Sequence, residues 1–375
     1  MTGDLALIAE RRGGIAALLG LLLLEEPGPR IGDYVSGIES LAPLGSGDPA
    51  IATEYERTFL RGVPLYESVF RSDDGQQGGN TVNTVTEQYG RLGFTEHLGN
   101  RWRVAGPDHL GLQLRCLAHL CHEEAMAWRA GTPDKAMELV ESERTFLAHH
   151  VAGWAPVAIH CALRFAGDGA YAPLLHAVAD HLTEEFDRLR PAPDLGSTIV
   201  TNPLPINLGP ARLTRLLLAP DTCGSWLSSA VIGHASRSIG APWRPSDSRA
   251  SLRHVIEDAQ NTGDLHIVLE PIAEHLDAAI EWYNQDAVLA PGNAANAQQW
   301  AATAQSMRDY LADLAETGLR RKGSAVFSEG VTIEGLDAAV LADVVDQLVQ
   351  SLRRDGFQVR VQGSRTHTAS AESET

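Results

Sequence analysis

The densest group of potentially reactive side chains in this sequence lies in one short segment. It reads Cys116-Leu-Ala-His119-Leu-Cys121-His122-Glu123-Glu124, and a metal-dependent hydrolase would use such a mixture of thiols, imidazoles and carboxylates. On a helix, position 119 shares a face with 116 and 123, whereas 121 and 122 point away, so the group does not converge on one metal ion. We therefore expect buried cysteines, His and Glu side chains on the solvated face, and no metal site. A helical hydrolase using this His/Glu/Cys cluster remains the alternative interpretation.

Other sequence signatures of catalysis are missing. The segment 321–324 reads Arg-Lys-Gly-Ser, which has the wrong order for a phosphate-binding loop, and neither a G-x-G-x-x-G turn nor a G-x-S-x-G elbow occurs. An enzyme built on a familiar catalytic motif is therefore not expected.

Helical periodicity dominates the chain and must position whatever site exists. The predicted helices span residues 4–24, 31–42, 48–60, 81–91, 107–129, 133–152, 154–166, 171–188, 210–218, 228–239, 248–260, 264–284, 297–317 and 334–355. Only 357–361 alternates like a strand, with 331–333 as its predicted partner. We expect an all-α fold with at most a small β-hairpin.

Composition marks the joints between parts of the chain. Proline and glycine concentrate in 189–210, which predicts a helical domain at 1–190 and a mostly helical extension at 191–362. The small, polar segment 363–375 is typical of a flexible tail.

The chain of 375 residues carries a net charge of -18. Such an excess of negative charge repels phosphate backbones and argues against nucleic-acid binding, while it favours basic partners. The four cysteines are few for this length, which predicts buried free thiols in a reducing compartment.

The N-terminal segment superficially resembles a twin-arginine export signal, because Arg11-Arg12 precedes an apolar run. However, Asp4 and Glu10 lie where such a leader is basic, and Glu25-Glu26-Pro27 follows without a small-x-small cleavage site. The run of about ten residues is also too short to span a bilayer. We expect a buried first helix, cytoplasmic residence and no stable membrane insertion.

Three joints between predicted helices combine aromatic and polar residues, and they carry a family resemblance. They are the segments 55–70, 106–110 and 146–156, which contain Tyr-Glu-Arg-Thr-Phe, Pro-Leu-Tyr-Glu-Ser-Val-Phe, Pro-Asp-His-Leu and Phe-Leu-Ala-His-His-Val-Ala-Gly-Trp. In this order the pieces resemble the TorD/DmsD family of redox-enzyme maturation chaperones. Thr58 departs from that pattern, since the family has Leu there, and the chain is longer than typical members.

The resemblance implies a cytoplasmic, cofactor-free helical chaperone. Its partners would be the apo form of a molybdenum or tungsten oxidoreductase catalytic subunit and the twin-arginine signal peptide of that enzyme. It would assist cofactor insertion and delay export until folding is complete. Binding of GTP or a homodimer that exchanges helices is also compatible with the resemblance, and neither the client nor the role of the extension follows from it.

Asp108 and His109 match the family's signature pair and are candidate contacts to the peptide. Asp108 equally fits ordinary helix-start chemistry after Pro107. His109 has less structural explanation, and its titration near neutrality would make binding pH-sensitive if it lies in the groove.

The other candidate client-binding residues lie in the two flanking joints. Tyr66, Glu67 and Ser68 follow a proline in a non-helical segment, where Tyr66 either projects into a cleft or fills the core. Trp154 precedes a helix start, and burial is favoured over a place in the groove; His150 is a weaker member of the set.

The role of residues 210–355 is open between stabilisation of the core, dimerisation and contact with the client. The amphipathic helix 334–355 is expected to pack in the core. A partner surface or a latch across the groove are the alternatives for this helix.

Overall fold

The fold is all-helical throughout the described part of the chain. The structure is a computed structural model that describes residues 2–72, 75–95, 106–190, 208–243, 248–289 and 291–321, and no strand occurs in these ranges. This confirms the predicted fold class. The predicted helix 334–355, the hairpin of 331–333 with 357–361 and the tail 363–375 lie outside the described residues.

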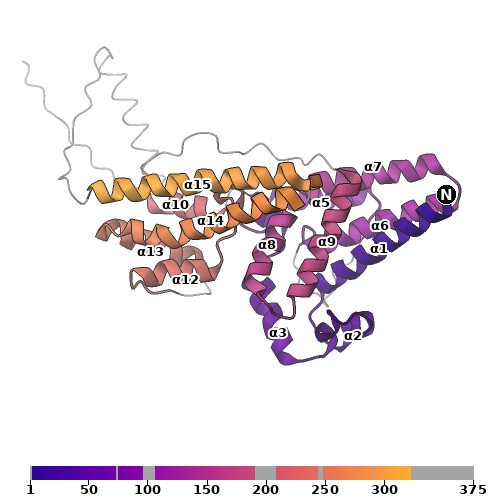
Figure 1. Ribbon diagram of the computed structural model, residues 1–375, viewed down its shortest axis with the longest axis horizontal. Helices are drawn as coiled ribbons and strands as arrows, with labels where there is room; N and C mark the ends of the chain where they lie inside the picture. Colours follow the sequence, from indigo (N-terminus) through magenta and orange to yellow (C-terminus); the bar gives the residue numbers. More distant parts are fainter. Residues whose placement is uncertain are drawn as a thin grey trace, which may run out of the picture. The chain divides into compact units, whose positions relative to one another are not determined.

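The α-helices follow one another along the described part of the chain (Figure 1). The first nine are α1 (Thr2–Leu24), α2 (Pro29–Val35), α3 (Pro49–Tyr55), α4 (Glu67–Arg71), α5 (Asn80–Arg91), α6 (Leu110–Arg129), α7 (Pro133–His150), α8 (Ala155–Ala166) and α9 (Ala172–Leu189). The others are α10 (Pro210–Leu218), α11 (Pro220–Cys223), α12 (Ser229–Ser238), α13 (Ser248–Thr262), α14 (Leu265–Leu289) and α15 (Ala294–Arg321).

Two predicted helices are interrupted. The predicted helix 31–42 ends at Val35, and residues Ala42–Gly45 form a separate 3-10 turn. The predicted helix 48–60 changes from α to π geometry at Glu56–Leu60. Hydrophobic periodicity reports which residues face the core, and it does not report these local changes in hydrogen bonding.

Close packing of α1 on α6 organises the N-terminal half (Figure 1). A Cβ at Gly13 would lie 3.0 Å from the Cβ of Cys121, and one at Gly20 would lie 2.6 Å from the carbonyl oxygen of Gly111. The two helices are thus antiparallel, and glycines allow their backbones to approach. The predicted buried first helix is confirmed.

Aromatic side chains fill the adjoining core. Tyr55, Phe59 and Tyr171 are buried with ring centroids 5.1–5.8 Å apart, which confirms the first two as packing residues. All four cysteines are buried free thiols, and burial raises the pKa of Cys116 and Cys223.

Helices α10–α15 pack directly on the first nine helices. Trp226 donates through Nε1 to the carbonyl oxygen of Gly62 at 2.9 Å, and Trp300 donates to that of Gly153 at 2.9 Å. The ring of His160 stacks on Trp282 with centroids 3.8 Å apart. All described residues belong to one compact unit, Met1–Ser324. The predicted division near residue 190 falls in 191–207, outside the described residues, and stays a prediction.

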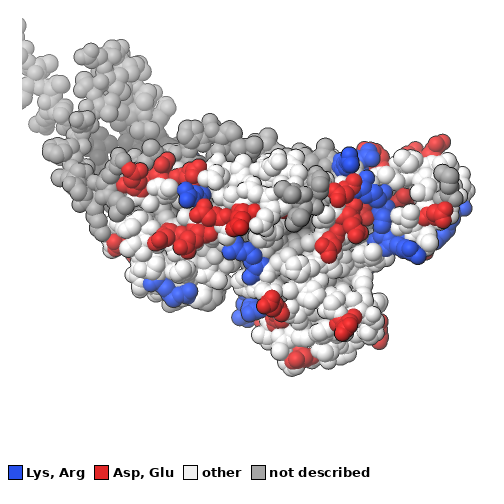
Figure 2. Space-filling view, in the orientation of Figure 1, with Lys and Arg blue, Asp and Glu red and all other residues white. Residues whose placement is uncertain are grey.

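Charged side chains are distributed over the surface. On the face shown in Figure 2, Asp and Glu form several groups, and Lys and Arg lie between and beside them. Among the described residues no single helix is long and apolar enough to cross a membrane, although α7 and α8, bent by 60°, satisfy length and composition as a pair.

Candidate functional site

The predicted site residues of the first two joints meet where α4 begins beside the start of α6. Tyr66 and His109 form an antiparallel bridge, in which Glu67 N donates to the Asp108 carbonyl oxygen at 3.0 Å. Leu110 N donates to the carbonyl oxygen of Leu65 at 2.9 Å. We call the buried contact of these segments with α7 the α4–α6–α7 junction.

Asp108 caps a helix, but not the one that follows it. Its side chain is 0% exposed, and Oδ2 accepts a hydrogen bond from Ser68 N at 2.9 Å, in the first turn of α4. In the part of the chain that the structure describes, Oδ1 has no hydrogen-bond partner. Helix α6 is capped instead by His109, whose Nδ1 accepts from Gly111 N at 3.0 Å. The predicted helix 107–129 therefore begins at Leu110.

Burial holds His109 neutral. The side chain is buried against Tyr66, with ring centroids 4.9 Å apart, and this burial lowers the pKa of His109 to about 3. The expectation of a titration near neutral pH at this position is therefore wrong, because that value belongs to a solvated imidazole.

Glu67 links α4 to α6 and α7. Its Oε2 accepts from Gln113 Nε2 at 2.7 Å and lies 3.2 Å from His150 Nδ1, while Oε1 lies 3.2 Å from Arg71 Nη1. Burial raises the pKa of Glu67, and the contacts with His150 and Arg71 oppose that shift.

Ser68 and Trp154 hold the neighbouring backbone. Ser68 Oγ accepts from Gly78 N at 3.0 Å, which ties the loop before α5 to α4. Trp154 is fully buried, as favoured from the sequence, and its Nε1 donates to the His150 carbonyl oxygen at 2.6 Å. Both side chains are therefore structural neighbours of the junction.

A surface hollow opens beside the junction. It has a volume of about 370 Å³. Its walls are Glu67, Arg71, Asn80, Thr81, Thr84, Glu87, Gln88, Arg91, His149 and His150. We call it the α4–α5–α7 hollow. Of the seven predicted site residues only Glu67 and His150 line it, and the other five do not.

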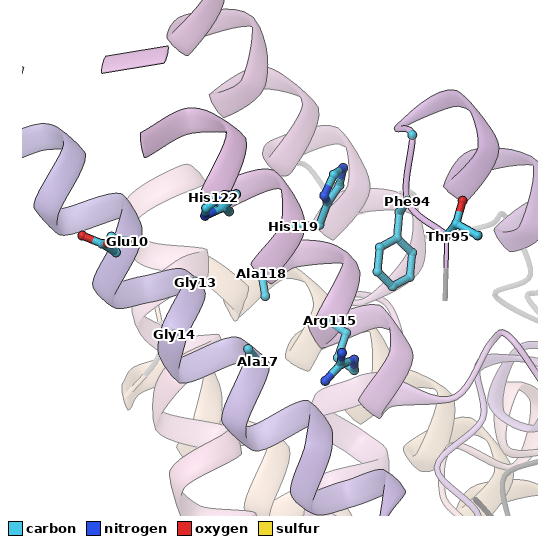
Figure 3. A pocket seen from close by; sticks show the side chains of 11 residues that line it. Glu10, Gly13, Gly14, Ala17, Phe94, Thr95, Arg115, Ala118, His119 and His122 are labelled. Atoms are coloured by element: carbon cyan, nitrogen blue, oxygen red, sulfur yellow. The ribbon is translucent and has the colours of Figure 1, made fainter. Parts of the chain in front are cut away.

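A second hollow of about 570 Å³ lies over the outward face of α6 (Figure 3). Small residues of α1, including Gly14, form one side, and Phe94 lies on the other. His119 lies 3.2 Å from the Leu92 carbonyl oxygen, and His122 is exposed. The side chains of the segment 116–124 do not converge on one point, as predicted. The described residues include no group of three or more His, Cys, Asp or Glu that could hold a metal.

Glu124 is the exception to the expected solvated face of the segment 116–124, because its side chain is buried and contacts Arg12. Nη1 of Arg12 lies 2.9 Å from Glu124 Oε2, and Nη2 lies 2.6 Å from Glu143 Oε2. Nε and Nη2 hold the two carboxylate oxygens of Glu185, each at 2.7 Å. Arg188 adds a second guanidinium at 2.5 Å from Glu143 Oε2. These five residues, from α1, α6, α7 and α9, are the Arg12 cluster.

The cluster contains three carboxylates and two guanidinium groups. Burial alone would lower the pKa of Arg12, but its hydrogen bond to Glu185 and the nearby carboxylates raise it overall. Burial favours the neutral form of Glu185, yet the hydrogen bond and charge of Arg12 lower its pKa. Burial raises the pKa of Glu143 to about 7, against the attraction of Arg12 and Arg188.

Sequence reasoning missed this cluster because its members are far apart in the chain. Arg12 lies 112 to 173 positions from its glutamates. The available signal was a carboxylate on the core-facing stripe of a helix, as at Glu143 beside Phe146 and Leu147, since an ionised buried carboxylate requires a partner.

The junction and the α4–α5–α7 hollow lie in the part of the chain that matches a known family. Residues 40–160, about a third of the chain, match the family model described as nitrate reductase delta subunit. The all-helical fold agrees with this match. Residues 40–160 of this chain are similar to the NarJ/TorD family of redox-enzyme maturation chaperones. No curated protein and no solved structure matches the chain.

Proposed function

We propose that this protein binds the apo catalytic subunit of a molybdenum or tungsten oxidoreductase and its twin-arginine signal peptide in the cytoplasm. It holds the subunit until the cofactor is inserted and so delays export. The observation that carries the proposal is the family match over 40–160, the segment that contains the junction and the α4–α5–α7 hollow.

The seven predicted site residues divide into two groups in this proposal. Glu67 and His150 line the hollow and contact the client there. Tyr66, Ser68, Asp108, His109 and Trp154 act as positioning residues, because they fix α4, the start of α6 and the end of α7 through buried contacts.

Charge supports a peptide ligand with a basic segment. The attraction comes from the whole chain, whose net charge is -18, because within the hollow Glu67 and Glu87 are paired with Arg71 and Arg91. A signal peptide combines basic and apolar segments, so long-range attraction would speed its encounter with this surface.

The test is to fill the hollow. Thr84 lines it from α5, so T84W should weaken binding of a molybdoenzyme twin-arginine signal peptide at least tenfold. T86W is the matched control, because Thr86 is an exposed threonine on the same helix, makes the same type of backbone hydrogen bond and does not line the hollow. Binding is measured with full-length protein by calorimetry. Equal affinities of the two variants would refute the role of the hollow, and no binding of any such signal peptide would refute the proposed function.

A further inference from the structure

Helix α1 places an arginine ahead of an apolar run, and the structure shows where each part lies. Arg11 is exposed, whereas Arg12 enters the Arg12 cluster. At the other end of the run, a Cβ at Gly111 would lie 2.7 Å from Leu24 Cγ and 3.2 Å from His109 Nδ1. The surface that α1 covers on α6, with the carboxylates of α7 and α9 at one end, is called the α1 bed. It extends from the buried carboxylates to the α4–α6–α7 junction.

The carboxylates of this bed are suited to a guanidinium group. Glu124, Glu143 and Glu185 receive Arg12 from three helices, and the planar fork of Nε and Nη2 matches the two oxygens of Glu185. Glu143 is 0% exposed, and its Oε1 has no hydrogen-bond partner among the described residues. Without Arg12, Arg188 would still face Glu143 and Glu185, but Glu124 would lose its ion pair and Glu185 its bidentate partner, so a replacement ligand should itself supply an arginine.

Two glycines of α1 lower its helix propensity without being needed for packing. Gly13 and Gly20 are needed for close approach to α6, but a Cβ at Gly3 or Gly14 would have no heavy atom within 4 Å. Glycine lowers helix stability relative to alanine, and at these two positions packing gives no compensation. The outward face also keeps apolar side chains in water, since Ile8 is 50% and Ile15 is 47% exposed.

We propose that α1 is a displaceable internal ligand. A client peptide in which an arginine precedes an apolar helix takes the place of α1 and sets its guanidinium among Glu124, Glu143 and Glu185. This inference rests on the proposed function, and it names the subsite for the signal-peptide arginine. Because α1 is tethered, its effective concentration is high, and a competitor must offset this with better contacts or a more stable helix.

The first test uses a defined probe. A peptide of residues 2–24 carrying G3A and G14A, fused through its C-terminus to a carrier protein, is added to the full-length protein. Hydrogen exchange by mass spectrometry should show faster exchange in α1 of the full-length protein, and the two alanines distinguish the peptide's fragments by mass. The same peptide with R12K should bind at least tenfold more weakly. Unchanged protection of α1, or equal binding of both peptides, would overturn the inference.

The second test strengthens α1 in the full-length protein without disturbing the fold. The double variant G3A/G14A should bind a molybdoenzyme signal peptide roughly two- to fivefold more weakly, mainly from the helix propensity at Gly14, since Gly3 lies in the first turn of α1. The control is G90A, because Gly90 is an exposed glycine of α5 whose Cβ would also meet nothing within 4 Å. Equal binding of the double variant and G90A would overturn the inference.

The two proposals fail in distinguishable ways. A signal peptide that binds while α1 stays protected overturns the displacement of α1 and leaves the proposed function standing. Displacement of α1 by the strengthened peptide, with no binding of any molybdoenzyme signal peptide, supports the exchange and refutes the proposed function.

Discussion

The Arg12 cluster and the α4–α6–α7 junction are two buried polar regions. They compensate the cost of burying charged and polar groups in different ways. In the Arg12 cluster, side-chain charges from four helices compensate one another. At the junction Glu67 also has side-chain partners, but Asp108 and His109 accept backbone N–H groups, and burial keeps His109 neutral.

This difference determines whether an external ligand could supply the interactions of each region. Backbone hydrogen bonds at the junction fix local chain geometry that no external ligand can reproduce. The carboxylates of the Arg12 cluster require only a guanidinium, and any chain that brings one in the right place satisfies them. We therefore expect the junction to act as a fixed frame and the Arg12 cluster to respond to mutation, pH and ligand.

The largest expected effect comes from removing Arg12. R12Q leaves three buried carboxylates without their main partner, so the free energy of unfolding should fall by about 3–5 kcal/mol. Chemical denaturation of the full chain measures this. R11Q is the control, because Arg11 is exposed, and it should change stability by no more than about 0.5 kcal/mol. Similar losses in the two variants would show that the cluster contributes little.

The next effect is a pH dependence centred on Glu143. Its pKa is about 7 in the folded protein against an ordinary value of 4.5, so the folded state holds its proton more tightly than the unfolded state. Stability from this group is thus complete below about pH 4.5 and is lost as the pH rises to about 7. E143Q cannot lose that proton. The difference in unfolding free energy, E143Q minus wild type, should therefore rise across this range by at most about 3 kcal/mol.

Taking this difference removes the opposing effect of buried histidines. Burial lowers the pKa of His109 and His160 to about 3, so both add stability as the pH rises toward 6.5 in either protein. A difference that stays flat from pH 4.5 to 7 would contradict a raised pKa for Glu143.

A smaller effect is expected at the junction. D108A removes the acceptor for Ser68 N and should lower the free energy of unfolding by about 1–3 kcal/mol. D313A, an exposed aspartate on α15, is the control and should be nearly neutral. A loss in D108A as large as that of R12Q would remove the contrast between the two regions.

Local patterns in the sequence predicted one of these regions better than the other. The helices around the core follow their apolar periodicity closely, and short motifs located Asp108, His109 and Glu67. The capping of α4 by Asp108 was not predictable, because it depends on a contact between residues 40 positions apart. The Arg12 cluster depends on still longer separations, so Arg12 resembled part of a signal when its role was to neutralise buried glutamates.

The most direct test of the central claim is a calorimetric titration of the full-length protein with a molybdoenzyme signal peptide and with its twin-lysine version. Chaperone function through a guanidinium subsite predicts saturable binding of the twin-arginine peptide and at least tenfold weaker binding of the twin-lysine peptide. Absence of binding, or equal affinity for both peptides, would contradict it.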